Sequence, residues 1–198
     1  MKVKLFFLSL GAIVLTYLIF TANNHQEMKM TVIYDDTTTI QENFSVFLQK
    51  DLEKLLPTTV NYYHKENLEI ENVVDKIKSN YNEIQEKLSS SNVIIVYLGD
   101  FELLYEKENI INIYSHLEDL FMLLRKYNSK QIIYISPINL TSNYLLKDLA
   151  SKHKINFINT PSMLQKFTTQ NYTLNIEDHK TIASNIFNNI VSTWKIEN

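Results

Sequence analysis

The chain has no cysteine and, in 198 residues, only two glycines, three prolines and one tryptophan. The lack of cysteine excludes disulfides, thiolate nucleophiles and zinc–thiolate sites. There is also no block of lysine or arginine, and the formal net charge is −3, which argues against a nucleic-acid-binding protein. Hydrophobic residues make up 45% and charged residues 21% of the chain, as is typical of a folded domain rather than a disordered segment.

The N-terminal segment has the features of a membrane anchor. Two lysines occur in residues 1–4, and the 18 residues 5–22 carry no charge. We therefore expect residues 1–4 in the cytoplasm, one transmembrane signal anchor at 5–22, a polar linker at 23–29 and a domain outside the membrane at 30–198. The alternative is a cleaved signal peptide and a secreted domain, although bulky residues precede the small-residue site at Thr21-Ala22-Asn23.

From Met30 onward, short apolar runs alternate with segments in which apolar residues recur every three or four positions. This alternation predicts an α/β fold: a three-layer α/β/α flavodoxin-like sandwich with a five-stranded parallel sheet, preceded by one N-terminal transmembrane helix. The expected strands are Thr31–Tyr34, Thr59–Tyr63, Asn92–Leu98, Gln131–Ser136 and Ile155–Ile158. The expected helices are Glu42–Leu56, Ile70–Leu88, Ile113–Tyr127, Ser142–His153 and Ile176–Trp194.

Two segments near the C-terminus carry local signals. Asn175 is the expected N-cap of the last helix, and Asp178 at its third position supports that start. The preceding segment, Thr160–Thr173, contains several apolar residues and is expected to be a loop that packs on the core, with an apolar lid over a site as the alternative.

In such a sheet the ligand site lies beyond the carboxyl ends of the strands. There Val32–Thr38, Val96–Glu102 and Thr173–Ala183 follow one another with a characteristic order and spacing, together with Ile132–Pro137 and Leu149–Thr160. In that order they resemble the conserved blocks of the SGNH (GDSL-type) hydrolases. The first is similar to the strand that runs into Gly-Asp-Ser-x-Thr, the second to the strand that runs into Gly-x-Asn-Asp, and the third to the stretch after Asp-x-x-His. The resemblance implies an esterase-like fold.

The same resemblance implies that the reactive groups are missing. The family uses a serine nucleophile, a histidine base, an aspartate and an oxyanion-binding asparagine. The corresponding positions hold Asp36, Thr173, Gln170 and Phe101, and no glycine occurs in His64–Asn67 where the second block has one. We therefore predict no catalytic residue, no cofactor and no metal.

The remaining candidates are cleft residues. His179 is expected on the helix surface or in support of the cleft, with a displaced general base as the alternative. The carboxylates are expected to be solvated rim charges, with Asp35 capping a turn; a divalent-cation site and acid–base catalysis are the alternatives. His64, His116 and His153 are expected in solvent. The candidate cleft residues are Asp35, Asp36, Thr37, Gly99, Asp100, Glu102, Thr173 and His179.

The favoured hypothesis for the function is a catalytically inactive SGNH-like domain held at the cell membrane, which binds an envelope glycan or an envelope protein. The first alternative is an active esterase or acyltransferase that acts on acylated envelope polymers with Asp36 or a threonine as nucleophile. The second is a receiver-like domain, because Asp35-Asp36, Asp100, Ser136 and Thr160-Pro161 resemble the phosphorylation site of response regulators. A plain structural module is the third.

Overall fold

The computed structural model describes residues 27–34, 43–64, 70–79, 83–98, 110–128, 130–137, 144–165 and 174–194. The strands are β1 (Met28–Tyr34), β2 (Thr58–His64), β3 (Val93–Tyr97), β4 (Gln131–Ile135) and β5 (Asn156–Ile158). The helices are α2 (Phe44–Leu52), α3 (Ile70–Ser79), α4 (Glu83–Ser90), α6 (Ile110–Tyr127), α7 (Tyr144–Lys152), α8 (Thr160–Leu164) and α9 (Ile176–Trp194).

The five strands form one parallel sheet in the order β2-β1-β3-β4-β5, which confirms the predicted sheet. β1 therefore lies between β2 and β3, and the connections reverse direction across the sheet at this point. Tyr34, the last residue of β1, is in register with Tyr97, the last residue of β3. The carboxyl ends of β1 and β3 thus lie side by side, where ligands bind in sheets of this type.

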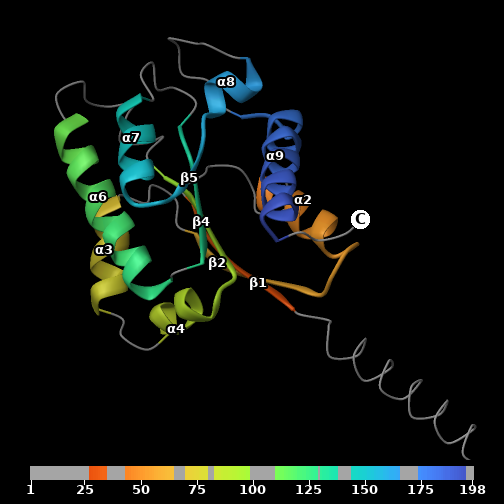
Figure 1. Cartoon of the computed structure of the whole chain (residues 1–198), viewed down its shortest axis with the longest axis horizontal. Coiled ribbons are helices and arrows are strands. Elements are labelled where there is room, and N and C mark those ends of the chain that lie inside the picture. Colours follow the sequence, from red (N-terminus) through yellow and green to blue (C-terminus); the bar gives the residue numbers. More distant parts are fainter. Residues whose placement is uncertain are drawn as a thin grey trace, which may run out of the picture.

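Helices cover both faces of the sheet, so the predicted three layers are present. Helices α3, α4, α6 and α7 lie on one side, and α2, α8 and α9 lie on the other (Figure 1). Strand β3 is buried along its whole length. Its side chains alternate: Ile94 and Val96 pack into one apolar cluster, and Val93, Ile95 and Tyr97 pack into the other.

Several boundaries differ from the predictions by one to four residues, and three differences matter for the fold. The single helix expected at Ile70–Leu88 is described as two helices, with residues 80–82 outside the described part. They are joined by a buried side chain, since Gln85 Nε2 donates to the carbonyl oxygen of Ile77 at 2.8 Å. Helix α2 ends at Leu52 rather than at Leu56: Glu53 is its C-cap, and the N–H groups of Leu55 and Leu56 donate to the carbonyl oxygen of Leu52 in a turn that follows.

The third difference is the start of β1, which lies inside the segment expected as linker. The strand begins at Met28 rather than Thr31, and Met28 is buried, with its N–H donating to the carbonyl oxygen of Pro57. The expected anchor at 5–22 lies outside the described residues. Within the described ranges, none of the helices combines the length and the apolar character needed to cross a bilayer.

Candidate functional site

An aromatic contact links the elements that meet at the carboxyl end of the sheet. Phe44, in the first turn of α2, packs edge-on against Tyr97, with 6.1 Å between ring centroids and 81° between ring planes. On its other side Phe44 lies nearly parallel to His179, with 6.4 Å between centroids and an angle of 23°. All three side chains are buried, so they form the packed base of this end of the molecule.

His179 is therefore not a surface residue. Its side chain is 0% exposed, and it lies on the buried stripe of α9 that continues with Ile182 and Ala183. Its ring packs on α2, and its backbone N–H donates to the carbonyl oxygen of Asn175 at 3.1 Å. The structure excludes the surface for this histidine; a supporting role and a displaced general base both stay predictions.

The other candidate cleft residues lie outside the described part of the chain: Asp35, Asp36, Thr37, Gly99, Asp100, Glu102 and Thr173. The structure does describe the residues that directly precede two of these segments. Tyr34 directly precedes Asp35 in the sequence, and Leu98 directly precedes Gly99; Tyr34 and Leu98 are both buried. In the described ranges no three His, Cys, Asp or Glu side chains are grouped so that they could hold a metal ion.

Ser136 and Thr160 are hydrogen-bonded to each other just beyond the carboxyl end of β4. The backbone N–H of Thr160 donates to Ser136 Oγ at 3.1 Å, and Thr160 Oγ1 donates to the carbonyl oxygen of Ser136 at 2.6 Å. Both residues are 0% exposed. The Ser136 hydroxyl thus supports the start of α8 instead of facing a ligand, which removes one of the features that suggested a receiver domain.

Helix α8 itself was missed, because Thr160–Thr173 was expected to be a loop. The signal for a helix start was present: Asn159 is the N-cap, with Oδ1 accepting from the N–H of Ser162 at 3.2 Å, and Pro161 stands in the first turn. Met163 and Leu164 are partly buried against the apolar cluster beneath α9, so this part of the segment packs on the core as predicted.

His153 is not in solvent either. Its side chain is 13% exposed, packs edge-on against Phe121 and has Nε2 at 3.6 Å from Glu118 Oε1. It was expected in solvent because a histidine near a helix end is usually exposed, and its contacts on α6 are not visible in the local pattern. His116 is half-buried on α6, and the side chain of His64 is not among those that the structure describes.

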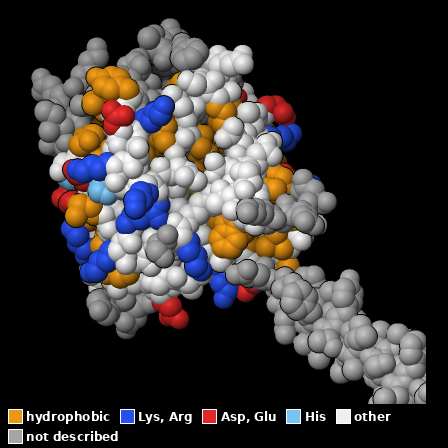
Figure 2. Space-filling view, in the orientation of Figure 1, with side chains coloured by type: hydrophobic (Ala, Val, Ile, Leu, Met, Phe, Trp, Pro, Cys, Tyr) orange, Lys and Arg blue, Asp and Glu red, His pale blue; other side chains and the backbone are white. Residues whose placement is uncertain are grey.

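The face drawn in Figure 2 carries separate apolar, basic and acidic side chains on a largely neutral surface. This distribution agrees with the small net charge of the chain. On this face there is no continuous basic area of the kind that binds nucleic-acid phosphates.

Comparison with known proteins gives no match by sequence, either to a family model or to a curated protein. Solved structures do match. A family two carbohydrate esterase from Clostridium thermocellum, solved in complex with cellohexaose, matches with a TM-score of 0.66 and 10% identity over 86% of this chain and 65% of that one. An aryl esterase from M. smegmatis gives 0.65 and 11% identity over 83% and 99%. Est24, a carbohydrate acetylesterase from Sinorhizobium meliloti, gives 0.59 and 10% identity over 83% and 99%.

The chain has the SGNH-hydrolase fold. This confirms the resemblance drawn from the order of the blocks. Matches at 10% and 11% identity show that the fold is shared; they do not show that an activity is shared.

Proposed function

We propose that this chain is a membrane-anchored, outward-facing domain that keeps the SGNH-hydrolase fold but has lost ester hydrolysis, and that it binds an envelope glycan or an envelope protein at the carboxyl end of its sheet. The observation that carries the proposal is the combination of this fold with Asp36, two residues after the last residue of β1, and Thr173, three residues before the first residue of α9. In SGNH enzymes those positions supply the nucleophile and the general base.

The surroundings of His179 support the loss of activity. A general base must come within hydrogen-bond reach of the proton that it removes, directly or through one water. His179 is the histidine of the C-terminal block, and its imidazole is fully buried against Phe44. A role in packing α9 on α2 accounts for its position without any catalytic step.

The proposed ligand class is supported by the expected location and by two of the structural neighbours. A signal anchor at residues 5–22 would hold the domain next to the cell envelope, where glycans are the abundant polymers. The matched proteins from Clostridium thermocellum and Sinorhizobium meliloti are carbohydrate esterases by name. A domain that keeps such a fold without its nucleophile can bind a glycan without cleaving its ester groups.

Hydrolysis of p-nitrophenyl acetate by the full-length protein in detergent tests the loss of activity. We expect no turnover above buffer for the natural sequence, for Asp36→Ala or for the control Asp75→Ala, which replaces an exposed carboxylate on α3. Turnover by the natural sequence and by Asp75→Ala, abolished in Asp36→Ala, would instead establish the alternative, an esterase that uses Asp36.

Co-sedimentation with purified, insoluble cell-wall polysaccharide tests the binding. We expect the full-length protein to pellet with the polysaccharide, and the double variant Asp36→Ala with Asp100→Ala to remain in the supernatant. Asp75→Ala is again the matched control and should pellet normally. Equal pelleting of all three proteins would exclude the carboxyl end of the sheet as the glycan site.

A further inference from the structure

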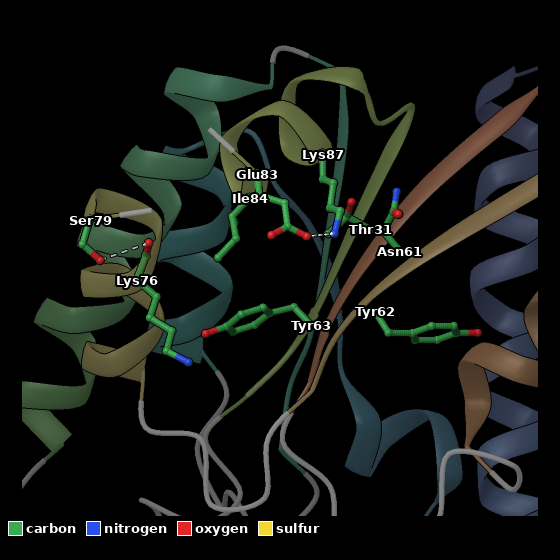
Figure 3. Close-up of a pocket in the computed structure, with 9 residues that line it drawn as sticks. All are labelled: Thr31, Asn61, Tyr62, Tyr63, Lys76, Ser79, Glu83, Ile84 and Lys87. Carbon is green, nitrogen blue, oxygen red and sulfur yellow. Dashed lines mark hydrogen bonds and ion pairs between the residues drawn. The ribbon is translucent and has the colours of Figure 1, made fainter. Parts of the chain in front are cut away.

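A cavity lies at the edge of the sheet, beside β2. It has a volume of about 490 Å³ and is enclosed by β2, by α3 and α4, and by one residue of β1 (Figure 3). Strand β2 is the outer strand of the sheet on this side. The side chains used below are Asn61 and Tyr63 from β2, Lys76 from α3, and Glu83 and Lys87 from α4.

The Tyr63 hydroxyl is a polar group that the protein leaves unsatisfied. Its oxygen is shielded from solvent and has no hydrogen-bond partner among the residues that the structure describes. Leaving such a group without a partner is destabilising, and native proteins almost always avoid it. The tyrosine ring packs against the apolar cluster under α3, so the hydroxyl cannot turn away to solvent without losing that packing.

Lys76 supplies a positive charge at the same place. Its ammonium lies over the Tyr63 ring, with Nζ 5.7 Å from the ring centroid, and no carboxylate within the described ranges pairs with it. Figure 3 shows the Lys76 side chain running down beside the Tyr63 hydroxyl. Because Lys76 is exposed, its side chain can change rotamer and uncover that hydroxyl.

The other two charges of the cavity neutralise each other. Lys87 Nζ donates to Glu83 Oε1 at 2.7 Å, and this hydrogen bond lowers the pKa of the Glu83 carboxyl from its ordinary value. The cavity therefore has one uncompensated positive charge, that of Lys76, beside one hydroxyl donor, that of Tyr63. Both groups require an acceptor, and an anionic oxygen satisfies both.

We propose that this cavity binds a small hydroxylated molecule through a phosphate or carboxylate group. The anionic oxygens accept from Lys76 Nζ and Tyr63 O–H, and the Asn61 side-chain amide meets a hydroxyl group of the ligand. A volume of about 490 Å³ lies within the range of sites for small molecules. The cavity lining includes none of the candidate cleft residues, so this site is tested separately from the function proposed above.

Isothermal titration calorimetry of the full-length protein in detergent at low salt tests this site. The probes are glucose 6-phosphate, glucuronate and glucose, which share a sugar body and differ in charge. The variants are Lys76→Gln, which removes the charge, and Tyr63→Phe, which removes only the hydroxyl. Lys78→Gln is the matched control, since Lys78 is an exposed lysine on the same helix and does not line the cavity.

We expect one of the two anions to bind and glucose not to bind; the anion that binds tells a phosphate site from a carboxylate site. Lys76→Gln and Tyr63→Phe should each raise the Kd about tenfold, as the loss of one hydrogen bond to a charged group does, and Lys78→Gln should leave it unchanged. Glu83→Gln should lower the Kd because it removes the one acidic lining group. If neither anion binds, if glucose binds equally well, or if Lys76→Gln and Lys78→Gln behave alike, the site does not exist.

Discussion

At the start of α9, the side chains of Asn175 and Asp178 each accept a hydrogen bond from the backbone N–H of the other residue. The N–H of Asn175 donates to Asp178 Oδ2 at 3.0 Å, and the N–H of Asp178 donates to Asn175 Oδ1 at 3.1 Å. This reciprocal capping box confirms the helix start predicted from the sequence. It matters for the site because α9 begins two residues after the buried Leu174 and carries His179 in its first turns.

Asn175→Ala should lower the free energy of unfolding by about 1 kcal/mol, because the N–H of Asp178 then has no side-chain partner. Chemical denaturation followed by circular dichroism measures this change. Asn188→Ala is the matched control: Asn188 is exposed in the middle of the same helix, where alanine is neutral or slightly favourable. Equal losses in the two variants would mean that the cap contributes nothing specific.

The Arg125 guanidinium ties α6 to the turn that follows α7. Its Nε donates to the carbonyl oxygen of His153 at 2.9 Å, its Nη1 to that of Lys130 at 2.6 Å, and its Nη2 to that of Lys154. Lys154 has a positive φ of 56°, an uncommon conformation that this bond stabilises. One planar guanidinium fork thus binds three carbonyl oxygens from two segments of the chain.

Arg125→Lys should lower the free energy of unfolding by about 1–3 kcal/mol, because an ammonium group cannot reach three carbonyl oxygens in the geometry of the fork. The reciprocal exchange on the neighbouring exposed residue, Lys126→Arg, should change it by less than about 0.5 kcal/mol. A loss in Arg125→Lys no larger than in Lys126→Arg would show that charge alone, and not the fork, is needed here.

The sheet could be predicted from the sequence because its signal is local. The apolar run at Val93–Tyr97 marks a strand covered on both faces, and the stripe through Ile182 and Ile186 marks the last helix. Boundaries that depend on distant partners could not be predicted. Met28 starts β1 because it pairs with Thr58 of β2, a relation invisible in the residues around it.

Only part of the candidate site could be predicted from the sequence. The order of the blocks led to the SGNH-hydrolase fold and so to the ends of β1 and β3. Nothing local, however, distinguishes a surface histidine from His179, since its burial depends on Phe44 from a different helix. Lys76 likewise looks like an ordinary solvated lysine in the sequence. Lys76 becomes a candidate ligand-binding group only because Tyr63, from the edge strand, lies beside it.

A pH dependence is expected from the contact between α6 and α7. Lys152 Nζ donates to Glu118 Oε1, and this hydrogen bond, helped by the charges of Lys152 and His153, lowers the pKa of the Glu118 carboxyl. A carboxyl whose pKa is lower in the folded state stabilises the protein above its unfolded pKa. That contribution is lost as the pH falls through the folded pKa.

Glu118→Gln should therefore lower stability slightly at neutral pH and flatten its decline between about pH 5 and pH 3 by the same small amount, small because the Lys152 side chain is largely exposed. Urea denaturation midpoints over this pH range measure the effect. Asp119→Asn, which changes the exposed carboxylate next in the chain, should leave the decline as steep as in the natural sequence. A steeper decline in Glu118→Gln would contradict the assignment.

The role of His179 can be separated into packing and catalysis by two substitutions at one position. His179→Ala leaves a cavity between α9 and Phe44, and we expect it to lower the free energy of unfolding by about 2 kcal/mol or more. His179→Phe keeps an aromatic ring beside Phe44 and should recover part of that loss. The matched control, His116→Ala on the half-buried side of α6, should cost less than either core change.

Hydrolysis of p-nitrophenyl acetate by the same variants gives the second readout. If His179 only packs α9 on α2, the rates of His179→Ala and His179→Phe equal that of the natural sequence wherever the proteins are folded. If it is a displaced general base, neither residue can take a proton, so both variants lose whatever turnover the natural sequence has. Measurable turnover by the natural sequence that is lost in a folded His179→Phe would assign the histidine to catalysis and overturn the proposed loss of activity.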